Sequence, residues 1–251
     1  MAVPIALQLY SVREDCAKDF LGTIERVAKM GYAGVEFAGY HGQSAVDIKR
    51  CLDDNGLKVA GTHAGFASLQ SDQIQETIEF HQAIGCENLV VPWLPEETRS
   101  SREACQKTAD QLNTITALLE PHGMRTGFHC HSGDMAPLEN GKSAWDYLGE
   151  FTGDRFIMQY DTANGMAGGA DPVQPILDWP GRGITVHLKE WSGEHGAEVI
   201  GEGMVPWERV FEACESVAGT QWYIVEHESY EGMTPIEAVE RCLKNLREMG
   251  K

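Results

Sequence analysis

Two residues that could do chemistry stand at the ends of neighbouring predicted strands. The apolar stretch FIMQY runs into Asp161, and GITVHL carries His187 and runs into Lys189. Side chains alternate along a strand, so Thr185, His187 and Lys189 share one face. Because ligands and catalytic groups gather at the carboxyl ends of parallel strands, Asp161 and His187 stand where a site is expected.

Other polar or aromatic residues stand at the ends of the remaining predicted strands: Gln8, Tyr10, Glu36, His63, Trp93, His129, His131 and Glu226. Each one alone has an ordinary explanation, such as a turn residue, a helix cap or a hydrogen-bonded core histidine. Their coincidence at successive strand ends is hard to explain by packing and indicates a site. Mixed histidine and carboxylate ligands suit a divalent metal such as Mn, Co, Zn or Mg, which polarises a carbonyl or hydroxyl at an open coordination position.

The stretch GFHCHSGDM contains a pair of histidines that need separate treatment. His129 and His131 are two positions apart, so a continuing strand would put both on one face and Cys130 on the other. Both could then face the pocket. In the alternative, one of them only hydrogen-bonds a neighbouring ligand.

Strand-like and helix-like segments alternate along the whole chain. The predicted strands are Ile5–Tyr10, Gly34–Phe37, Lys58–His63, Asn88–Pro92, Arg125–His131, Phe156–Asp161, Gly183–Lys189 and Trp222–Glu226. The predicted helices are Asp19–Met30, Ser44–Asn55, Ser71–Ile84 with Ser71 as its cap, Ser100–His122, Ser143–Phe151, one from Asp171, Trp207–Ala218 and Thr234–Met249. This pattern predicts one (β/α)8 TIM barrel over residues 1–251. A doubly wound open sheet is the alternative, but it usually needs a glycine-rich phosphate loop after the first strand, whereas LQLYSVRED, which runs from within that strand past its end, has no glycine.

Composition limits the partners. The formal net charge of −18 argues against nucleic acid, which needs a basic surface, and favours a small or cationic ligand. Seven scattered cysteines without a CxxC pair indicate reduced, buried residues. No run is long and apolar enough to span a bilayer, so we expect a cytoplasmic protein without a membrane partner. A homo-oligomer is left open.

Several stretches, in this order, resemble one family: LQLYSVRED, GYAGVEFAGYHG, HCHSGDM, YDTANGMAGGADP, HLKE, GEGMVPW and IVEHES. Together they are similar to the sugar phosphate isomerase/epimerase family of xylose isomerase-like barrels. Within it, the chain is closest to the subset with an HNH motif, which has inosose dehydratase-like and keto-sugar lyase members. The resemblance covers essentially the whole chain and is fairly specific for the superfamily, but weak for the substrate.

The resemblance implies a divalent metal held by residues at the ends of the last four strands. Asp161, His187 and Glu226 match the ligands of the sixth, seventh and eighth strands. On the fifth strand the family's glutamate is missing, and His129, His131 or Asp134 could replace it.

The resemblance also implies proton abstraction next to a carbonyl of a sugar or polyol. Glu226 would be one base, with Glu36, His63, His129 or Lys189 opposite, and Gln8, Tyr10, Trp93 and His129 would contact the substrate. An isomerase or epimerase is the first expectation, and a dehydratase or lyase acting on a keto-sugar or keto-inositol is the alternative. A non-catalytic sugar-binding barrel is a third hypothesis. A DNA-repair endonuclease of the same superfamily conflicts with the acidic charge.

Overall fold

Eight parallel strands form a near-closed barrel, the TIM barrel that the sequence predicts. The computed structural model describes residues 2–193, 198–230 and 232–251. The strands are β1 (Ile5–Gln8), β2 (Gly34–Phe37), β3 (Lys58–His63), β4 (Asn88–Val91), β5 (Arg125–His129), β6 (Ile157–Gln159), β7 (Thr185–Leu188) and β8 (Trp222–Val225). They pair in the order β6-β5-β4-β3-β2-β1-β8-β7. An isolated parallel bridge between Asp161 and His187 connects the two ends of this sheet.

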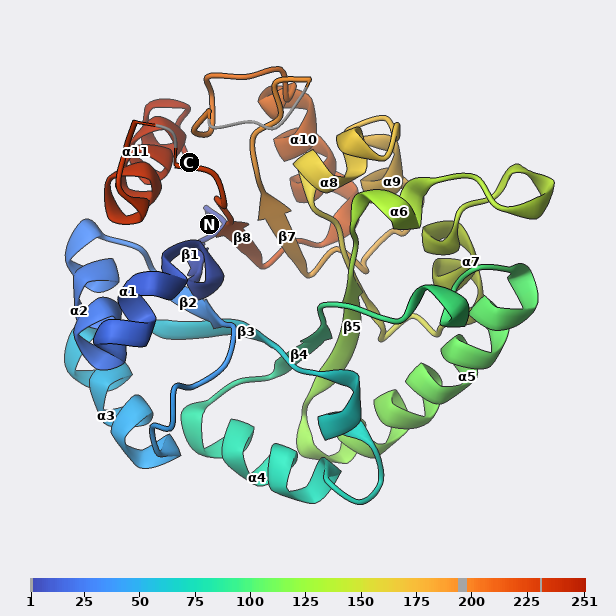
Figure 1. The fold of residues 1–251 in the computed structure, drawn as a ribbon, viewed down its shortest axis with the longest axis horizontal. Helices are drawn as coiled ribbons and strands as arrows, with labels where there is room; N and C mark the ends of the chain where they lie inside the picture. The colour runs from blue at the N-terminus through green and yellow to red at the C-terminus, as the bar shows by residue number, and fades with distance from the viewer. Residues whose placement is uncertain (1, 194–197, 231) are drawn as a thin grey trace.

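Helices surround the strands on the outside (Figure 1). They are α1 (Arg13–Lys18), α2 (Phe20–Met30), α3 (Ala45–Asn55), α4 (Ile74–Ile84), α5 (Arg102–Leu119), α6 (Ser132–Met135), α7 (Ala144–Phe151), α8 (Thr162–Ala167), α9 (Gln174–Leu177), α10 (Trp207–Ala213) and α11 (Pro235–Glu248). The local sequence sets several ends. Ser44 caps α3 through a hydrogen bond from Asp47 N, and Gly56 ends that helix in the left-handed conformation, with φ of 67°.

Alternation along the strands divides the molecule into an outer apolar core and a barrel interior. Leu7, Val186 and Val225 pack in the large core beneath the helices. Ala6, Ala60 and Ile224 form a separate small cluster inside the barrel. Side chains two positions apart share a face, so Gln8 and Glu226, each two positions beyond Ala6 or Ile224, also point inward and lie above this apolar cluster.

Two strand glycines, Gly127 and Gly61, stand where a Cβ would meet a close neighbour. A Cβ at Gly127 of β5 would lie 2.5 Å from the carbonyl oxygen of Ile157, so only glycine fits there. A Cβ at Gly61 of β3 would lie 2.9 Å from Oε1 of Glu36. Gly61 therefore leaves space inside the barrel for the Glu36 carboxylate.

The structure corrects several predicted boundaries. The first strand ends at Gln8, and a 3-10 turn, Leu9–Val12, and α1 follow it. Ser71 does not cap the helix after β3, because that helix begins at Ile74 and has no side-chain cap. The fifth strand ends at His129, two residues earlier than predicted. The short helices α1, α6 and α8 follow β1, β5 and β6, where the sequence pattern indicates loops.

The structure tests what the composition predicts for the cysteines and for membrane spans. All seven cysteines are free and buried, as predicted. In the described part of the chain, none of the helices combines the length and apolar character that a bilayer crossing requires.

Candidate metal centre and pocket at the barrel mouth

Four buried side chains meet at the carboxyl ends of β5 to β8. His129 is the last residue of β5, Asp161 caps α8 after β6, His187 lies in β7, and Glu226 follows β8. One potential ligand atom from each lies within 4.8 Å of those of the others. We call these four residues the mouth cluster.

The mouth cluster contains an unsatisfied acceptor. Asp161 Oδ1 accepts a hydrogen bond from Asn164 N at 2.7 Å, but its buried Oδ2 has no hydrogen-bond partner. Burial, helped by nearby Glu226, outweighs Lys189 and His187 and raises the pKa of Asp161 to about 6. A buried acceptor without a partner is costly, and a cation would satisfy it. Two imidazoles and two carboxylates form a suitable donor set for a divalent metal, so these residues fit the ion.

His187 connects the mouth cluster to the barrel interior. Its Nδ1 lies 2.5 Å from Glu226 Oε2 and 3.9 Å from Asp161 Oδ2, whereas its Nε2 lies 2.6 Å from Glu36 Oε2. Burial disfavours the imidazolium, but Glu36 and Glu226 outweigh burial and raise the pKa of His187 to about 10. Nδ1 therefore faces the cluster, and Glu36 orients the ring from behind, as carboxylates do for metal-binding histidines.

Glu36 lies at the centre of this interior network. Its carboxylate also accepts hydrogen bonds from Gln8 Nε2 at 2.7 Å and from Gln159 Nε2 at 2.9 Å. Burial opposes its ionisation, yet His63 and His187 outweigh burial and lower the pKa of Glu36. Glu36 and Gln8, which we expected to act on or bind substrate, are both fully buried beneath the mouth cluster.

Among the three fifth-strand alternatives, the structure brings His129 into the mouth cluster. Asp134 lies elsewhere: its Oδ1 is 2.7 Å from Arg99 Nη1, and its Oδ2 accepts a hydrogen bond from His131 N at 2.7 Å. His131 lines the pocket next to His129, with ring centroids 5.0 Å apart. The strand ends at His129, so the alternation that would align the two imidazoles no longer applies.

A pocket of about 480 Å³ opens above the mouth cluster. Its lining includes Tyr10, His63, Trp93, His131, Glu226 and Glu228. The predicted substrate-binding residues Tyr10 and Trp93 are 43% and 60% exposed, so their rings are available to a ligand. In the described part of the chain, the only formally charged lining residues are Glu226 and Glu228.

Lys189 does not line this pocket itself but contacts Glu228, which does. Its Nζ pairs with Glu228, and it lines an adjoining pocket of about 290 Å³ that Glu228 also borders. Burial favours the neutral amine, but Glu226, Asp161 and Glu228 outweigh it and raise the pKa of Lys189. Lys189 is therefore an ammonium group paired with Glu228.

Sequence reasoning missed two buried polar residues near the site, Gln159 and Glu190, and the half-buried Asn164. Gln159 and Asn164 contact His129, and the carboxylate of Glu190 accepts hydrogen bonds from three backbone N–H groups and from Trp207 Nε1. Gln159 is a polar residue inside an apolar strand, two positions before Asp161, and this inward position was the signal that could have found it.

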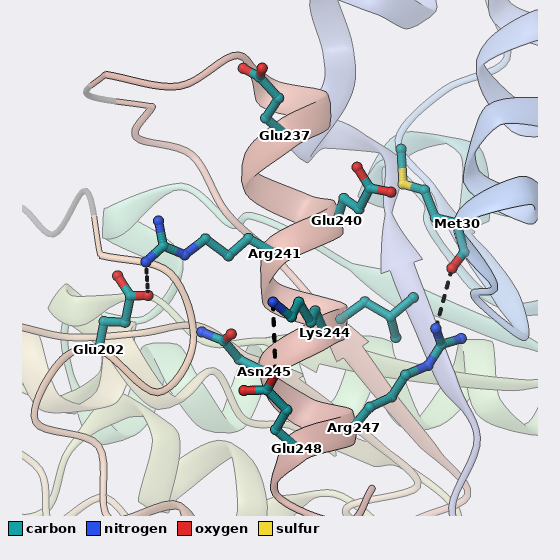
Figure 2. Close-up of a pocket in the computed structure, with 10 residues that line it drawn as sticks. Met30, Glu202, Glu237, Glu240, Arg241, Lys244, Asn245, Arg247 and Glu248 are labelled. Atoms are coloured by element: carbon teal, nitrogen blue, oxygen red, sulfur yellow. Dashed lines mark hydrogen bonds and ion pairs between the residues drawn. The ribbon is translucent and has the colours of Figure 1, made fainter.

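A second hollow of about 830 Å³ lies along α11, between that helix, Met30 and Glu202 (Figure 2), and shares no lining residue with the pocket above the mouth cluster. Its charged side chains are largely paired with neighbours. Arg241 pairs with Glu202, Lys244 lies 3.8 Å from Glu248, and Arg247 donates to the carbonyl of Gly31 at 2.9 Å. These pairs leave no converging set of unsatisfied groups comparable to the mouth cluster.

Comparisons with known proteins agree with this architecture. Inosose dehydratase of Geobacillus kaustophilus (strain HTA426) is 23% identical over 189 residues, and the match covers 66% of this chain but only 60% of that enzyme. Inosose dehydratase of Geobacillus thermodenitrificans (strain NG80-2) is 22% identical over 264 residues, with 90% of this chain and 88% of that enzyme covered.

Solved structures share the fold. A sugar phosphate isomerase/epimerase from Parabacteroides distasonis ATCC 8503 has a TM-score of 0.83 and 23% identity, with 98% of each chain covered. The IolI protein with a bound zinc atom has a TM-score of 0.74 and 15% identity, with 98% of this chain and 97% of that chain covered. The model of the xylose isomerase-like TIM barrel family matches residues 24–249. The chain therefore belongs to the xylose isomerase-like TIM barrel family.

Proposed function

We propose that the protein is a divalent-metal-dependent enzyme that abstracts a proton next to the carbonyl of an uncharged sugar or polyol derivative. The observation that carries this proposal is the unsatisfied Oδ2 of Asp161 in a buried cluster of four potential ligands, directly below an open pocket. His129, Asp161, His187 and Glu226 would hold the metal. When bound, it would supply Lewis-acid stabilisation for the negative charge that develops on the carbonyl oxygen. The zinc atom in the related IolI structure is consistent with this assignment.

Glu226 is the proposed base. It belongs to the mouth cluster and also lines the pocket. Although burial opposes its ionisation, Lys189 and His187 lower its pKa well below the ordinary value. Glu226 is therefore a carboxylate at neutral pH and can accept a proton from carbon. His63 and His131 line the same pocket from β3 and from the end of β5, three places away from β8 around the barrel. Burial lowers the pKa of His131, so its imidazole is neutral and can take part in proton exchange.

The pocket lining favours an uncharged substrate. Its formally charged described residues are carboxylates, Glu226 and Glu228, and the nearby Lys189 is already paired with Glu228. A phosphate group would therefore meet negative charge, and the Arg13 guanidinium, stacked 4.5 Å from the centre of the Tyr10 ring, already donates to Tyr10 O and Tyr230 Oη. The exposed faces of Tyr10 and Trp93 suit the apolar face of a sugar ring.

Isomerisation or epimerisation is the first candidate outcome. Glu226 would remove the proton, the electron pair would pass into an enolate, and a group across the pocket would return a proton to carbon. Loss of water is the second candidate, favoured by one observation. Glu228, the other carboxylate of the lining, is paired with Lys189, so the pocket does not present two free opposed carboxylates. In this outcome the proton that Glu226 removes would pass to the departing hydroxyl, which leaves as water, the product that the dehydratase activity named for two relatives would give.

Solvent-exchange measurements test the proposal and distinguish its outcomes. We would incubate the protein with Mn²⁺ or Co²⁺ in D₂O and follow a panel of keto-sugars and keto-inositols by NMR and mass spectrometry. Deuterium uptake with retained hydroxyls would indicate an isomerase or epimerase, and loss of water would indicate a dehydratase. Glu226→Gln should abolish exchange, whereas the control Glu228→Gln should retain most of it. Exchange that survives Glu226→Gln would contradict the assigned base. Binding of sugar and metal without exchange would favour the sugar-binding barrel.

A further inference from the structure

Gln159, the last residue of β6, is fully buried beneath the mouth cluster and uses every hydrogen-bonding position of its amide. Its Nε2 donates to Glu36 Oε1 at 2.9 Å and to Thr185 Oγ1 at 2.8 Å. Its Oε1 lies 2.9 Å from His63 Nε2 and 3.1 Å from His129 Nδ1. An amide has two donor hydrogens and two acceptor lone pairs, so no capacity is left over.

The surroundings fix the orientation of this amide. The carboxylate oxygens of Glu36 receive the side-chain N–H groups of Gln8 and His187 as well, so the NH₂ group of Gln159 must face them. The carbonyl oxygen of Gln159 must then face the two imidazoles. A carbonyl oxygen only accepts, and His129 therefore presents a protonated Nδ1 to it.

Asn164 imposes the same tautomer from the opposite side of the ring. Its Nδ2 donates to the carbonyl oxygen of Cys130 at 3.0 Å and lies 3.5 Å from His129 Nε2. That contact places an N–H group opposite His129 Nε2, which is favourable only if Nε2 carries a lone pair.

We propose that Gln159 is a positioning residue, which holds His129 in the Nδ1–H tautomer and leaves Nε2 free as a ligand atom of the mouth cluster. This inference rests on the proposed metal site. His129 Nε2 lies 3.9 Å from Glu226 Oε2, so its lone pair is on the side of the cluster. The same amide binds Glu36, which orients His187 through Nε2. One side chain thereby supports both imidazole ligands.

The first test determines the tautomer of His129 by ¹⁵N NMR of wild-type protein without metal or substrate. Protein with ¹⁵N-labelled histidine is compared with the His129→Gln variant, which identifies the signals of His129. We expect a protonated Nδ1 and an unprotonated Nε2. A proton on Nε2 would overturn the proposal, and this result does not depend on whether any variant folds.

The second test separates positioning from stability. Gln159→Met keeps the approximate size of the side chain but removes the acceptor, whereas Thr185→Val removes a different partner of the same amide and leaves His129 bonded to Gln159. We expect Gln159→Met to weaken Co²⁺ affinity by about 10–100-fold and to lose the Nδ1–H signal, with Thr185→Val close to wild type in both. Equal Co²⁺ affinities and unchanged tautomers in the two variants would show a merely structural role and overturn the proposal. The tautomer of His129 is determined without metal, so this test can fail while the metal site is correct. Whether the protein binds a metal at all is measured separately, by elemental analysis.

Discussion

His187 Nε2 lies 2.6 Å from Oε2 of Glu36, so a carboxylate with no exposed surface holds the ring from inside the barrel. This contact makes His187 Nδ1 the nitrogen that faces Asp161 and Glu226. The site therefore has two layers. The mouth cluster presents the ligand atoms, and buried residues beneath it, such as Glu36, fix the direction of these atoms through hydrogen bonds.

Replacement of Glu36 by glutamine should weaken metal binding. Side-chain N–H groups of Gln8, Gln159 and His187 all point at Glu36, and the NH₂ group of a glutamine would oppose one of these donors. We expect the divalent-metal affinity of Glu36→Gln to fall by about 10–100-fold in a calorimetric titration.

Glu190→Gln is the matched control for this variant. Glu190 is also a buried carboxylate surrounded by donors, but these belong to the segment around Trp191, Gly201, Val205 and Trp207. Its replacement should lower the melting temperature and leave the metal affinity within about twofold of wild type, since it lies outside the cluster. Equal losses of affinity in both variants would contradict a specific role for Glu36.

Alanine at Gly61 should destabilise the barrel interior. The added Cβ would lie 2.9 Å from Glu36 Oε1 and 3.2 Å from the carbonyl oxygen of Asn88, and both distances are shorter than ordinary van der Waals contacts. We expect the free energy of unfolding to fall by about 1–3 kcal/mol in urea denaturation, as for other overpacked interiors. Gly65→Ala is the control, because a Cβ there would meet no atom within 4 Å and its φ of −60° suits alanine. A stable Gly61→Ala protein would refute the close packing around Glu36.

Substrates without phosphate should be preferred. If the acidic lining of the pocket meets the substrate, kcat/KM for an uncharged keto-sugar should exceed that for its phosphate ester by at least about tenfold. Glu228→Gln should reduce this preference for the uncharged keto-sugar, because the substitution removes one negative charge and frees the ammonium group of Lys189. A wild-type preference for the phosphate ester would contradict the proposed substrate class.

His81 should make the stability of the metal-free protein depend on pH. Burial lowers the pKa of His81, whose ring contacts Thr77 O at 2.6 Å and Tyr40 Oη at 2.7 Å. The unfolded chain binds a proton near the ordinary histidine pKa of about 6.5, while the folded protein does so only at lower pH. This contribution to stability is therefore present above pH 6.5 and is lost as the pH falls below it. Thermal unfolding of His81→Gln should show a smaller loss between pH 7 and pH 5 than wild type, and an identical loss would refute the assignment.

The fold could be predicted from sequence because strand and helix patterns, caps and glycine stops repeat locally along the chain. The positions of Asp161, His187 and Glu226 at strand ends follow from the same local rules. The choice between His129 and His131 could not be made, because it depends on where β5 ends and α6 begins. The role of Gln159 could not be predicted, because its partners lie far apart in the sequence and only closure of the barrel brings them together.

Elemental analysis of protein purified without added metal tests the central claim most directly. Wild type is compared with a variant that carries both Asp161→Ala and His187→Ala. The account predicts about one divalent ion per wild-type chain and none in the double variant, whose folding is checked by circular dichroism. No bound metal in wild type, even after incubation with manganese or cobalt, would contradict the metal centre, and retention of the ion by a folded double variant would contradict its location.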